Sequence, residues 1–299
     1  MRIFLQRMTA ACLLAAGVLF GPAETASASR PIAVYGNLPG YEMAALSPSG
    51  ERVALVGVAA DARRLIVLDK DGEPLLAIPL GDQKLRTINW AGEDLVLLHY
   101  SQTVNLGMDF VAEKAELSTM LVVPVKGGKP WSVFAGDRTI TGGIRGFYGA
   151  IEREGRWYGY FGGITLTENG RSETFLGDTN PELYEVDLQT RRATRIARRI
   201  SQDNLRTWLI GPDGKIAATL DFVPQSGGWK IGNGGGKIVA SGRSPRGGID
   251  LISLGRTAGT MVYSVEDEAT GEDRWFEMPL AGGDATEILK DEQVGGNFI

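Results

Sequence analysis

The 299-residue sequence has little of the side chains that many enzymes use for chemistry. Cys12 is the only cysteine and lies in the leader predicted below, so the mature chain has no disulfide, catalytic thiolate or cysteine-based zinc site. His99 is the only histidine, which excludes a metal site built from several histidines. No Gly-x-Ser-x-Gly pattern occurs, although this is the turn that presents the serine of α/β-hydrolases.

The chain also lacks an excess of positive charge. The formal net charge is −5, and the predicted leader, residues 1–28, carries two arginines and one glutamate, which leaves −6 on the mature part. Nucleic-acid binding needs a basic surface, so we expect no nucleic-acid partner.

The N-terminus is predicted to be a secretory signal peptide. Two arginines lie in the first seven residues, and residues 8–20 are apolar apart from Thr9. The small-residue pattern Ala26-Ser27-Ala28 is typical of a cleavage site, so we expect cleavage after Ala28. The apolar run is too short to span a bilayer. We therefore expect a periplasmic or secreted protein with no stable membrane insertion; an uncut N-terminal anchor is the alternative.

What the sequence does contain is glycine and a repeat. Its 41 glycines are about twice the average usage of roughly 7%, which indicates many turns and therefore many short strands. One apolar strand recurs, and its clearest copies follow Pro, Gly and Asp turn signals such as Ser47-Pro-Ser-Gly50. We interpret this strand as the first strand of each repeat, and its copies begin near residues 51, 93, 155, 214 and 259.

A β-hairpin follows most copies of this strand. In each hairpin two apolar segments flank a short turn that contains Gly, Pro, Asp or Thr. The predicted pairs are 65–68 with 75–78, 121–123 with 131–134, 183–186 with 193–197, and 275–278 with 285–289.

The spacings between copies are 42, 62, 59 and 45 residues. The short ones match a four-stranded propeller blade of roughly 40–50 residues. The long ones predict insertions at 102–118 and 162–180, between a blade's second and third strands. Segment 225–248 is the least patterned, and we interpret it as the loop-rich half of the fourth repeat. The predicted fold is an all-β propeller over residues 29–299, with about five blades and an incomplete C-terminus.

Four segments resemble a known family. Three of them are Leu46-Ser-Pro-Ser-Gly-Glu-Arg-Val-Ala54, its companion Leu65-Ile-Val-Leu-Asp69, and the later Leu183-Tyr-Glu-Val-Asp-Leu188. These three look like parts of blades from the propeller of prolyl-oligopeptidase-like serine peptidases. The opening Ile32-Ala-Val-Tyr-Gly-Asn-Leu-Pro39 resembles the mature start of exported bacterial members. The resemblance covers about residues 30–299.

The resemblance implies a function for the chain. In that family the propeller restricts substrate size, and a C-terminal hydrolase domain with a Ser-Asp-His triad cleaves the peptide. We therefore expect the substrate-gating propeller portion of an exported serine peptidase, inactive alone, whose partners are a peptide substrate or a hydrolase domain. A stand-alone periplasmic propeller that binds a protein or peptide is the alternative. A metal-dependent propeller enzyme such as a lactonase is disfavoured, because histidines and clear metal carboxylates are missing.

We predict no catalytic, cofactor-binding or metal-binding residues, and no cofactor. A Ser-His-Asp triad needs a histidine base, and His99 lies inside a predicted strand, so we interpret it as structural. Gly232-Asn-Gly-Gly-Gly-Lys237 hints at a phosphate loop. However, Ile231 holds the position of the first glycine of that motif, and Ile238 the position of its Ser or Thr.

The charged and aromatic clusters have structural interpretations as well. Asp69 to Glu73 and Glu266 to Glu268 could offer calcium ligands, but both segments are expected in solvated turns. The basic run from Arg191 to Arg199 predicts an exposed strand face, with an anionic ligand or membrane surface as the alternative. The six tryptophans are expected mostly at inter-blade packing, with a sugar-binding platform as the alternative. They are Trp90, Trp131, Trp157, Trp208, Trp229 and Trp275.

Overall fold

The computed structural model describes residues 40–59, 62–105, 113–168, 174–201 and 203–290. The chain divides into two units, residues 1–39 and 40–299, and every described residue belongs to the second unit. The predicted signal peptide, its cleavage site and the domain start at residue 29 lie outside the described residues. No described segment is a helix, so none of them can cross a membrane as one.

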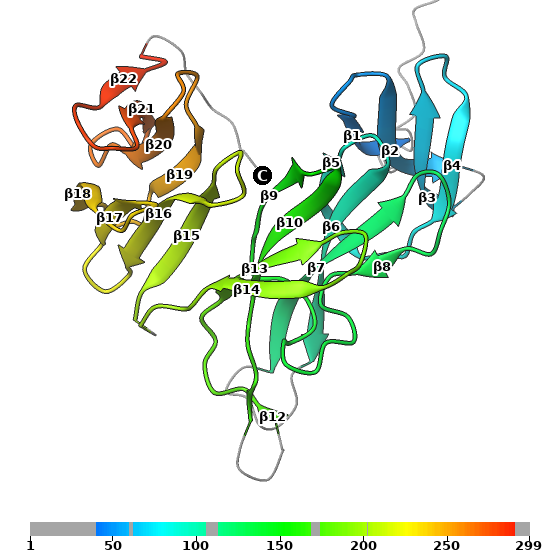
Figure 1. The fold of residues 1–299 in the computed structure, drawn as a ribbon, viewed down its shortest axis with the longest axis horizontal. Helices are drawn as coiled ribbons and strands as arrows, with labels where there is room; N and C mark the ends of the chain where they lie inside the picture. The colour runs from blue at the N-terminus through cyan, green and yellow to red at the C-terminus, as the bar shows by residue number, and fades with distance from the viewer. Residues whose placement is uncertain (1–39, 60–61, 106–112, 169–173, 202, 291–299) are drawn as a thin grey trace, which may run out of the picture. The chain divides into compact units, whose positions relative to one another are not determined.

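The described residues form five four-stranded antiparallel sheets, each built from strands that follow one another along the chain (Figure 1). We call these sheets blades 1 to 5. Blade 1 contains β1 (Tyr41–Leu46), β2 (Arg52–Ala59), β3 (Ala62–Asp69) and β4 (Pro74–Pro79); blade 2 contains β5 (Lys84–Ala91), β6 (Leu95–Asn105), β7 (Lys114–Pro124) and β8 (Trp131–Ser132).

The remaining blades follow the same plan. Blade 3 also carries a two-stranded sheet, β11 (Thr167–Glu168) with β12 (Thr174–Phe175), between its second and third strands. Blade 3 contains β9 (Phe147–Arg153), β10 (Arg156–Gly163), β13 (Glu182–Asp187) and β14 (Ala193–Ala197); blade 4 contains β15 (Leu205–Ile210), β16 (Ile216–Val223), β17 (Gly228–Asn233) and β18 (Ile238–Arg243); blade 5 contains β19 (Ile249–Leu254), β20 (Thr260–Glu266), β21 (Asp273–Pro279) and β22 (Thr286–Ile288).

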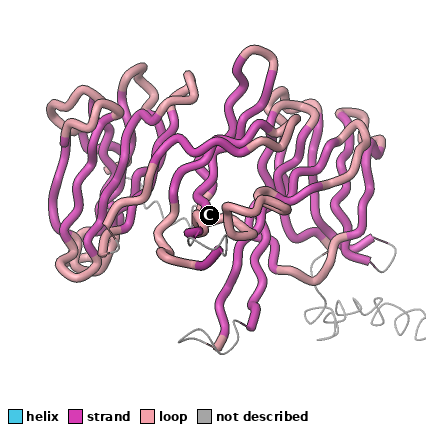
Figure 2. Tube along the Cα trace, turned by 60° about the horizontal axis from the view of Figure 1, so that its bottom comes forward, coloured by secondary structure: helices cyan, strands magenta, loops and turns pink. Residues whose placement is uncertain are grey.

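The apolar cores lie between the blades. Strands make up the body of each sheet and loops gather at its ends (Figure 2). The first strands of consecutive blades are neighbours: β1 contacts β5, β5 contacts β9, β9 contacts β15, and β15 contacts β19. Because side chains alternate along a strand, each inner blade can pack on a neighbour with both of its faces.

Four buried clusters fill the four interfaces between blades. Each combines side chains from two consecutive blades, for example Leu65 of blade 1 with Leu98 of blade 2. Blade 2 meets blade 3 through Leu97 and Phe161, and blade 3 meets blade 4 through Leu183 and Trp208. Blades 4 and 5 meet through a cluster that includes Ile231 and Met261. Within the described part of the chain no strand pairing joins blade 5 to blade 1, so the predicted all-β, unclosed propeller is confirmed.

The prediction that the recurring strand is the first strand of each blade was wrong by one strand. The segments near 51, 93, 155, 214 and 259 are the second strands of the blades, namely β2, β6, β10, β16 and β20. The first strand lies before each turn signal, as β1 lies before Ser47 to Gly50. The four predicted hairpins are confirmed as β3–β4, β7–β8, β13–β14 and β21–β22.

One prediction about an irregular segment needs correction. Segment 225–248 is not loop-rich, because β17 and β18 form a regular hairpin within it. The extra length that was assigned to 102–118 lies, as predicted, between the second and third strands of blade 2, where β6 and β7 remain paired out to Asn105 and Lys114. Blade 2 is also followed by a long connection at 133–146, between β8 and β9. The insertion at 162–180 lies, as predicted, between the second and third strands of blade 3.

Candidate functional site

His99, the only histidine, lies in β6 and is half-buried. It pairs with Thr87 of β5 and with Met120 of β7, which belongs to the cluster between blades 2 and 3. Burial, and then the positive charge of Arg86, lower the pKa of the imidazole. Its Nε2 atom is buried and has no hydrogen-bond partner among the residues described. His99 therefore lies inside a strand, as the sequence predicted.

The glycine-rich segment 232–237 is the turn of the β17–β18 hairpin. The Asn233 side-chain oxygen accepts hydrogen bonds from the amides of Gly235 (3.1 Å) and Lys237 (3.0 Å). The Asn233 amide also donates to the carbonyl of Lys237, at 2.9 Å. Because the asparagine already takes up the turn amides that a phosphate would need, the segment is a side-chain-stabilised hairpin turn.

Both carboxylate clusters are turns of the same kind. Asp69 accepts hydrogen bonds from the amides of Asp71 and Glu73, at 3.0 and 2.9 Å. Asp267 accepts hydrogen bonds from the amides of Ala269 and Thr270, at 2.9 and 3.1 Å. Within the described ranges, no three histidine, cysteine, aspartate or glutamate side chains lie where they could hold one metal ion.

The basic run is exposed, as predicted, but only residues 193–197 of it form a strand, β14. Three of its arginines have partners within the molecule. Arg195 pairs with Glu182 at 2.9 Å, Arg199 pairs with Asp178 at 2.9 Å, and the guanidinium of Arg191 lies 5.4 Å from the ring centre of Trp131. These contacts hold the outer part of blade 3 in place.

Five of the six tryptophans contact a neighbouring blade or the core that two blades share. Trp90 of β5 donates a hydrogen bond to the carbonyl of Ala45 in β1, at 3.0 Å. Trp157 lies against Gly92 of blade 2, where a Cβ would come within 2.5 Å of the indole nitrogen. Trp208 meets Tyr148 edge-on at 5.2 Å, Trp229 lies 6.1 Å from Tyr263, and Trp131 packs against the cluster between blades 2 and 3. The inter-blade prediction is confirmed for these five.

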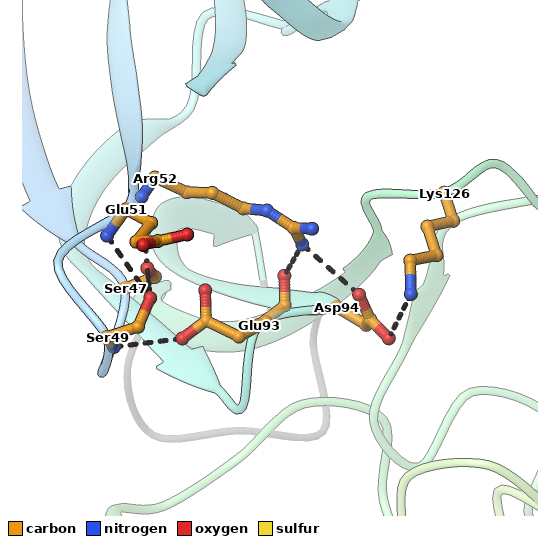
Figure 3. Close-up of polar contacts among 7 residues, drawn as sticks. All are labelled: Ser47, Ser49, Glu51, Arg52, Glu93, Asp94 and Lys126. Carbon is orange, nitrogen blue, oxygen red and sulfur yellow. Dashed lines mark hydrogen bonds and ion pairs between the residues drawn. The ribbon is translucent and has the colours of Figure 1, made fainter. Parts of the chain in front are cut away.

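The Ser47–Gly50 turn of blade 1 forms a polar network with the first turn of blade 2 (Figure 3). The Ser49 amide donates to the Glu93 carboxylate at 2.9 Å. The Arg52 guanidinium donates to the main-chain carbonyl of Glu93 and pairs with Asp94 at 3.2 Å, and Lys126 pairs with the other oxygen of Asp94 at 3.0 Å. The turn motif that the sequence singled out therefore fixes one blade against the next.

Sequence reasoning missed a buried carboxylate in blade 3. Glu182 is only 3% exposed, and it accepts hydrogen bonds from Thr165 and Arg195. Burial opposes its ionisation, but these hydrogen bonds outweigh burial and lower the pKa of Glu182. The hydroxyls of Thr165 and Tyr184 also pair with each other. The cluster joins the segment that follows β10 to the first residue of β13, a contact between residues 17 positions apart that no local pattern indicates.

The outer face of blade 1, opposite blade 2, exposes apolar side chains. Ala54 packs towards blade 2, so the alternating side chains of Val53 and its partner Leu46 face the other way. Leu46 is 68% exposed and Tyr41, on the same strand, is 70% exposed. These two side chains, at opposite ends of β1, leave apolar area of the strand in contact with water.

No protein-family model and no curated protein matches the chain. Solved structures do match. An oligogalacturonate lyase in complex with manganese is similar with a TM-score of 0.51 and 11% identity, over 84% of this chain and 66% of that one. An acylaminoacyl peptidase in complex with Z-Gly-Gly-Phe-chloromethyl ketone is similar with a TM-score of 0.46 and 13% identity. That match covers 84% of this chain and only 38% of the peptidase chain.

A third match is the β-propeller domain of the Trilobed protease from Pyrococcus furiosus, with a TM-score of 0.45 and 12% identity, over 87% of this chain and 69% of that one. At these identities the likeness concerns the fold alone. The described residues form five consecutive four-stranded antiparallel blades, as the sequence repeat predicted.

Proposed function

We propose that this chain is the non-catalytic, substrate-gating propeller portion of an exported serine peptidase, and that it is inactive alone. The observation that carries the proposal is where the buried side chains and the single histidine lie. The buried clusters all lie between blades, and the sole histidine lies half-buried inside a strand with its pKa lowered by burial. A serine nucleophile needs a base that can take its proton, and this arrangement favours a base supplied by another domain.

The exposed outer face of blade 1 supports a partner for this chain. Leu46 and Tyr41 leave apolar area in water that a further blade or a hydrolase domain would cover. Burying each side chain fully would contribute about 1.5–3 kcal/mol. The predicted signal peptide, residues 1–28, with cleavage after Ala28, supports a periplasmic or secreted location for the proposed peptidase.

A stand-alone periplasmic propeller that binds a protein or peptide is the second candidate. The same exposed apolar face favours it, because a binding surface for a separate protein has the same chemistry. The reading frame beyond codon 299 separates the two candidates. A hydrolase with a Gly-x-Ser-x-Gly elbow in that frame supports the peptidase portion, and an unrelated sequence supports the independent module.

The proposal that the chain is inactive alone can be tested directly. The purified chain is incubated with a fluorophosphonate serine reagent and with fluorogenic peptide substrates, beside an intact prolyl-oligopeptidase-type enzyme as the positive control. We expect no labelled serine and no cleavage above the background rate. Stoichiometric labelling of one serine, with peptide cleavage that the reagent abolishes, would overturn the proposal.

A further inference from the structure

The hairpin of blade 2 is longer than the matching hairpin of blade 1. Strands β6 and β7 have 11 residues each, whereas β2 and β3 have 8 each. The blade 2 face that packs on blade 1 therefore continues past the end of blade 1. In that overhang lies a pocket of about 290 Å³, closed on its other side by the connection from Pro79 to Gln83.

The lining of this overhang pocket is aliphatic inside and uncharged at its rim. Leu80, Leu117 and Leu121 supply apolar walls, and the exposed side chains of Gln83 and Gln102 lie at the solvent side. The full lining is Pro79, Leu80, Gly81, Gln83, Tyr100, Ser101, Gln102, Leu117, Thr119, Leu121 and Ser132. None of these side chains is ionised at neutral pH, so the pocket offers nothing to pair with a charged ligand.

One wall of the pocket is held by an arginine whose charge is paired with a glutamate. Arg63 donates to both carboxylate oxygens of Glu42, each at 2.7 Å. It also donates to the carbonyls of Gly81 (2.6 Å) and Gln83 (2.7 Å), within the connection that closes the pocket. The hydrogen bond that Arg63 donates to Glu42 raises the pKa of Arg63 despite its burial, so the charge of the arginine remains paired with Glu42. The pocket is thus a preformed site, as ligand sites usually are.

Tyr100 provides the polar anchor. This side chain is 9% exposed and lines the pocket, and its hydroxyl has no hydrogen-bond partner among the residues described. Burial raises its pKa to about 12, so the hydroxyl stays protonated at neutral pH and can both donate and accept. Because the residue lines the pocket, this hydroxyl can pair with a group bound there. By contrast, the Ser101 hydroxyl is already engaged by Arg86 and Glu116.

We propose that the overhang pocket binds an uncharged aliphatic side chain of a peptide, with the Tyr100 hydroxyl and the amides of Gln83 and Gln102 pairing with peptide groups. A cavity of about 150 Å³ can hold benzene, so a pocket about twice that size accommodates a leucine-like side chain. The leucine-rich interior favours such a side chain over a sugar. The site rests on this pocket alone and does not depend on the chain being part of a peptidase.

The test uses three tripeptides, acetyl-Ala-X-Ala-amide with X as Leu, Asp or Lys, titrated into the full chain while backbone amide NMR shifts are recorded. We expect the Leu peptide to bind at millimolar concentrations and to shift the amides of residues 100–102 and 117–121. The Asp and Lys peptides should bind at least tenfold more weakly. The Tyr100→Phe variant should lose about fivefold in affinity for the Leu peptide, because it removes one hydrogen bond and little volume.

Substitutions of two exposed residues on β6, one at the pocket and one on the other face, test the proposal even if Tyr100→Phe disturbs the core. Gln102 lies at the pocket, and the neighbouring Thr103 alternates to the other face of the strand. Gln102→Arg should weaken Leu peptide binding at least fivefold, and Thr103→Arg should leave it unchanged. Equal binding of all three peptides, equal effects of the two arginine variants, no binding at millimolar concentrations, or stronger binding of maltotriose with the same shifts would each overturn the proposal.

Discussion

Blade 3 packs on blade 2 with one face and on blade 4 with the other, and the two interfaces are built differently. Among the described residues, twelve buried side chains fill the interface between blades 2 and 3, whereas four fill the interface between blades 3 and 4. In the larger interface Phe161 stacks on Phe147 at 5.2 Å and meets Phe134 edge-on at 6.3 Å. Apolar packing is therefore the main source of cohesion there.

On the side of the smaller interface that belongs to blade 3, polar contacts within that blade lie close to Gly214 of blade 4. The Tyr160 hydroxyl donates to Glu185 at 2.9 Å, and Arg153 pairs with the same carboxylate at 2.6 Å. The guanidinium of Arg153 also lies 4.2 Å from the ring centre of Tyr158. A row of blades is stabilised by terms between neighbours, so the interface with fewer buried apolar side chains is expected to be the weaker one.

The largest effect is expected from Phe161→Ala in the larger interface. Phe161 is 0% exposed, and truncation of a buried phenylalanine costs about 3–5 kcal/mol through lost transfer free energy and the cavity that remains. The measurement is the unfolding free energy of blades 2 and 3 from urea denaturation followed by hydrogen exchange. A cost below about 1 kcal/mol would contradict the packing described for this interface.

A pH experiment addresses the blade 2 side of blade 3 through Glu182. Hydrogen bonds from Thr165 and Arg195 lower the pKa of Glu182 in the folded state. Its contribution to stability is therefore present above the pKa it has when unfolded and is lost as pH falls through the folded value. Glu182→Gln should cost about 1–3 kcal/mol at neutral pH and remove this part of the acid sensitivity. An unchanged slope of stability against pH below about pH 5 in the variant would count against the assignment.

A smaller effect is expected in the interface between blades 3 and 4. Tyr160→Phe removes the hydrogen bond to Glu185 and should cost about 0.5–1.5 kcal/mol. The matched control is Tyr263→Phe in the interface between blades 4 and 5, because Tyr263 is also buried and its hydroxyl has no partner among the residues described. Equal costs for the two variants would mean that the hydroxyl of Tyr160 contributes nothing specific.

The smallest effect concerns the interface between blades 1 and 2. Asp94 pairs with Arg52 and Lys126, and its side chain is 51% exposed. Asp94→Asn should therefore cost only about 0.2–1 kcal/mol, and the difference should vanish at about 1 M salt because such exposed pairs are screened. Urea denaturation of both proteins at low and high salt measures it. A cost that salt leaves unchanged would show that Asp94 acts through hydrogen bonds to its neighbours.

The sequence was informative where a strand pair is joined by a tight turn. Asp69 to Pro74, for example, contains Gly72 at φ 83°, a conformation that glycine adopts freely, and β3 and β4 pair on either side of it. The first strands were harder to recognise. β1 is largely exposed and β9 contains Gly149 at φ 107°, so neither shows the apolar alternation of a half-buried strand.

Tertiary contacts explain the remaining errors. Segment 225–248 was interpreted as a loop because of its glycines, yet a Cβ at Gly242 of β18 would come within 2.5 Å of the Cζ2 atom of the Trp229 indole ring. This glycine makes room for a tryptophan that packs on blade 5. The overhang pocket and the Glu182 cluster bring together residues from segments distant in the chain, so they were not predictable from local patterns.

The central claim is that each blade is stabilised by its immediate neighbours. Hydrogen exchange measured strand by strand in the Phe161→Ala variant tests it most directly. We predict that amides in β6, β7, β10 and β13 lose protection, while those in β20 and β21 of blade 5 exchange as in the unmodified chain. A uniform loss of protection across all five blades would contradict the claim and indicate a single cooperative core.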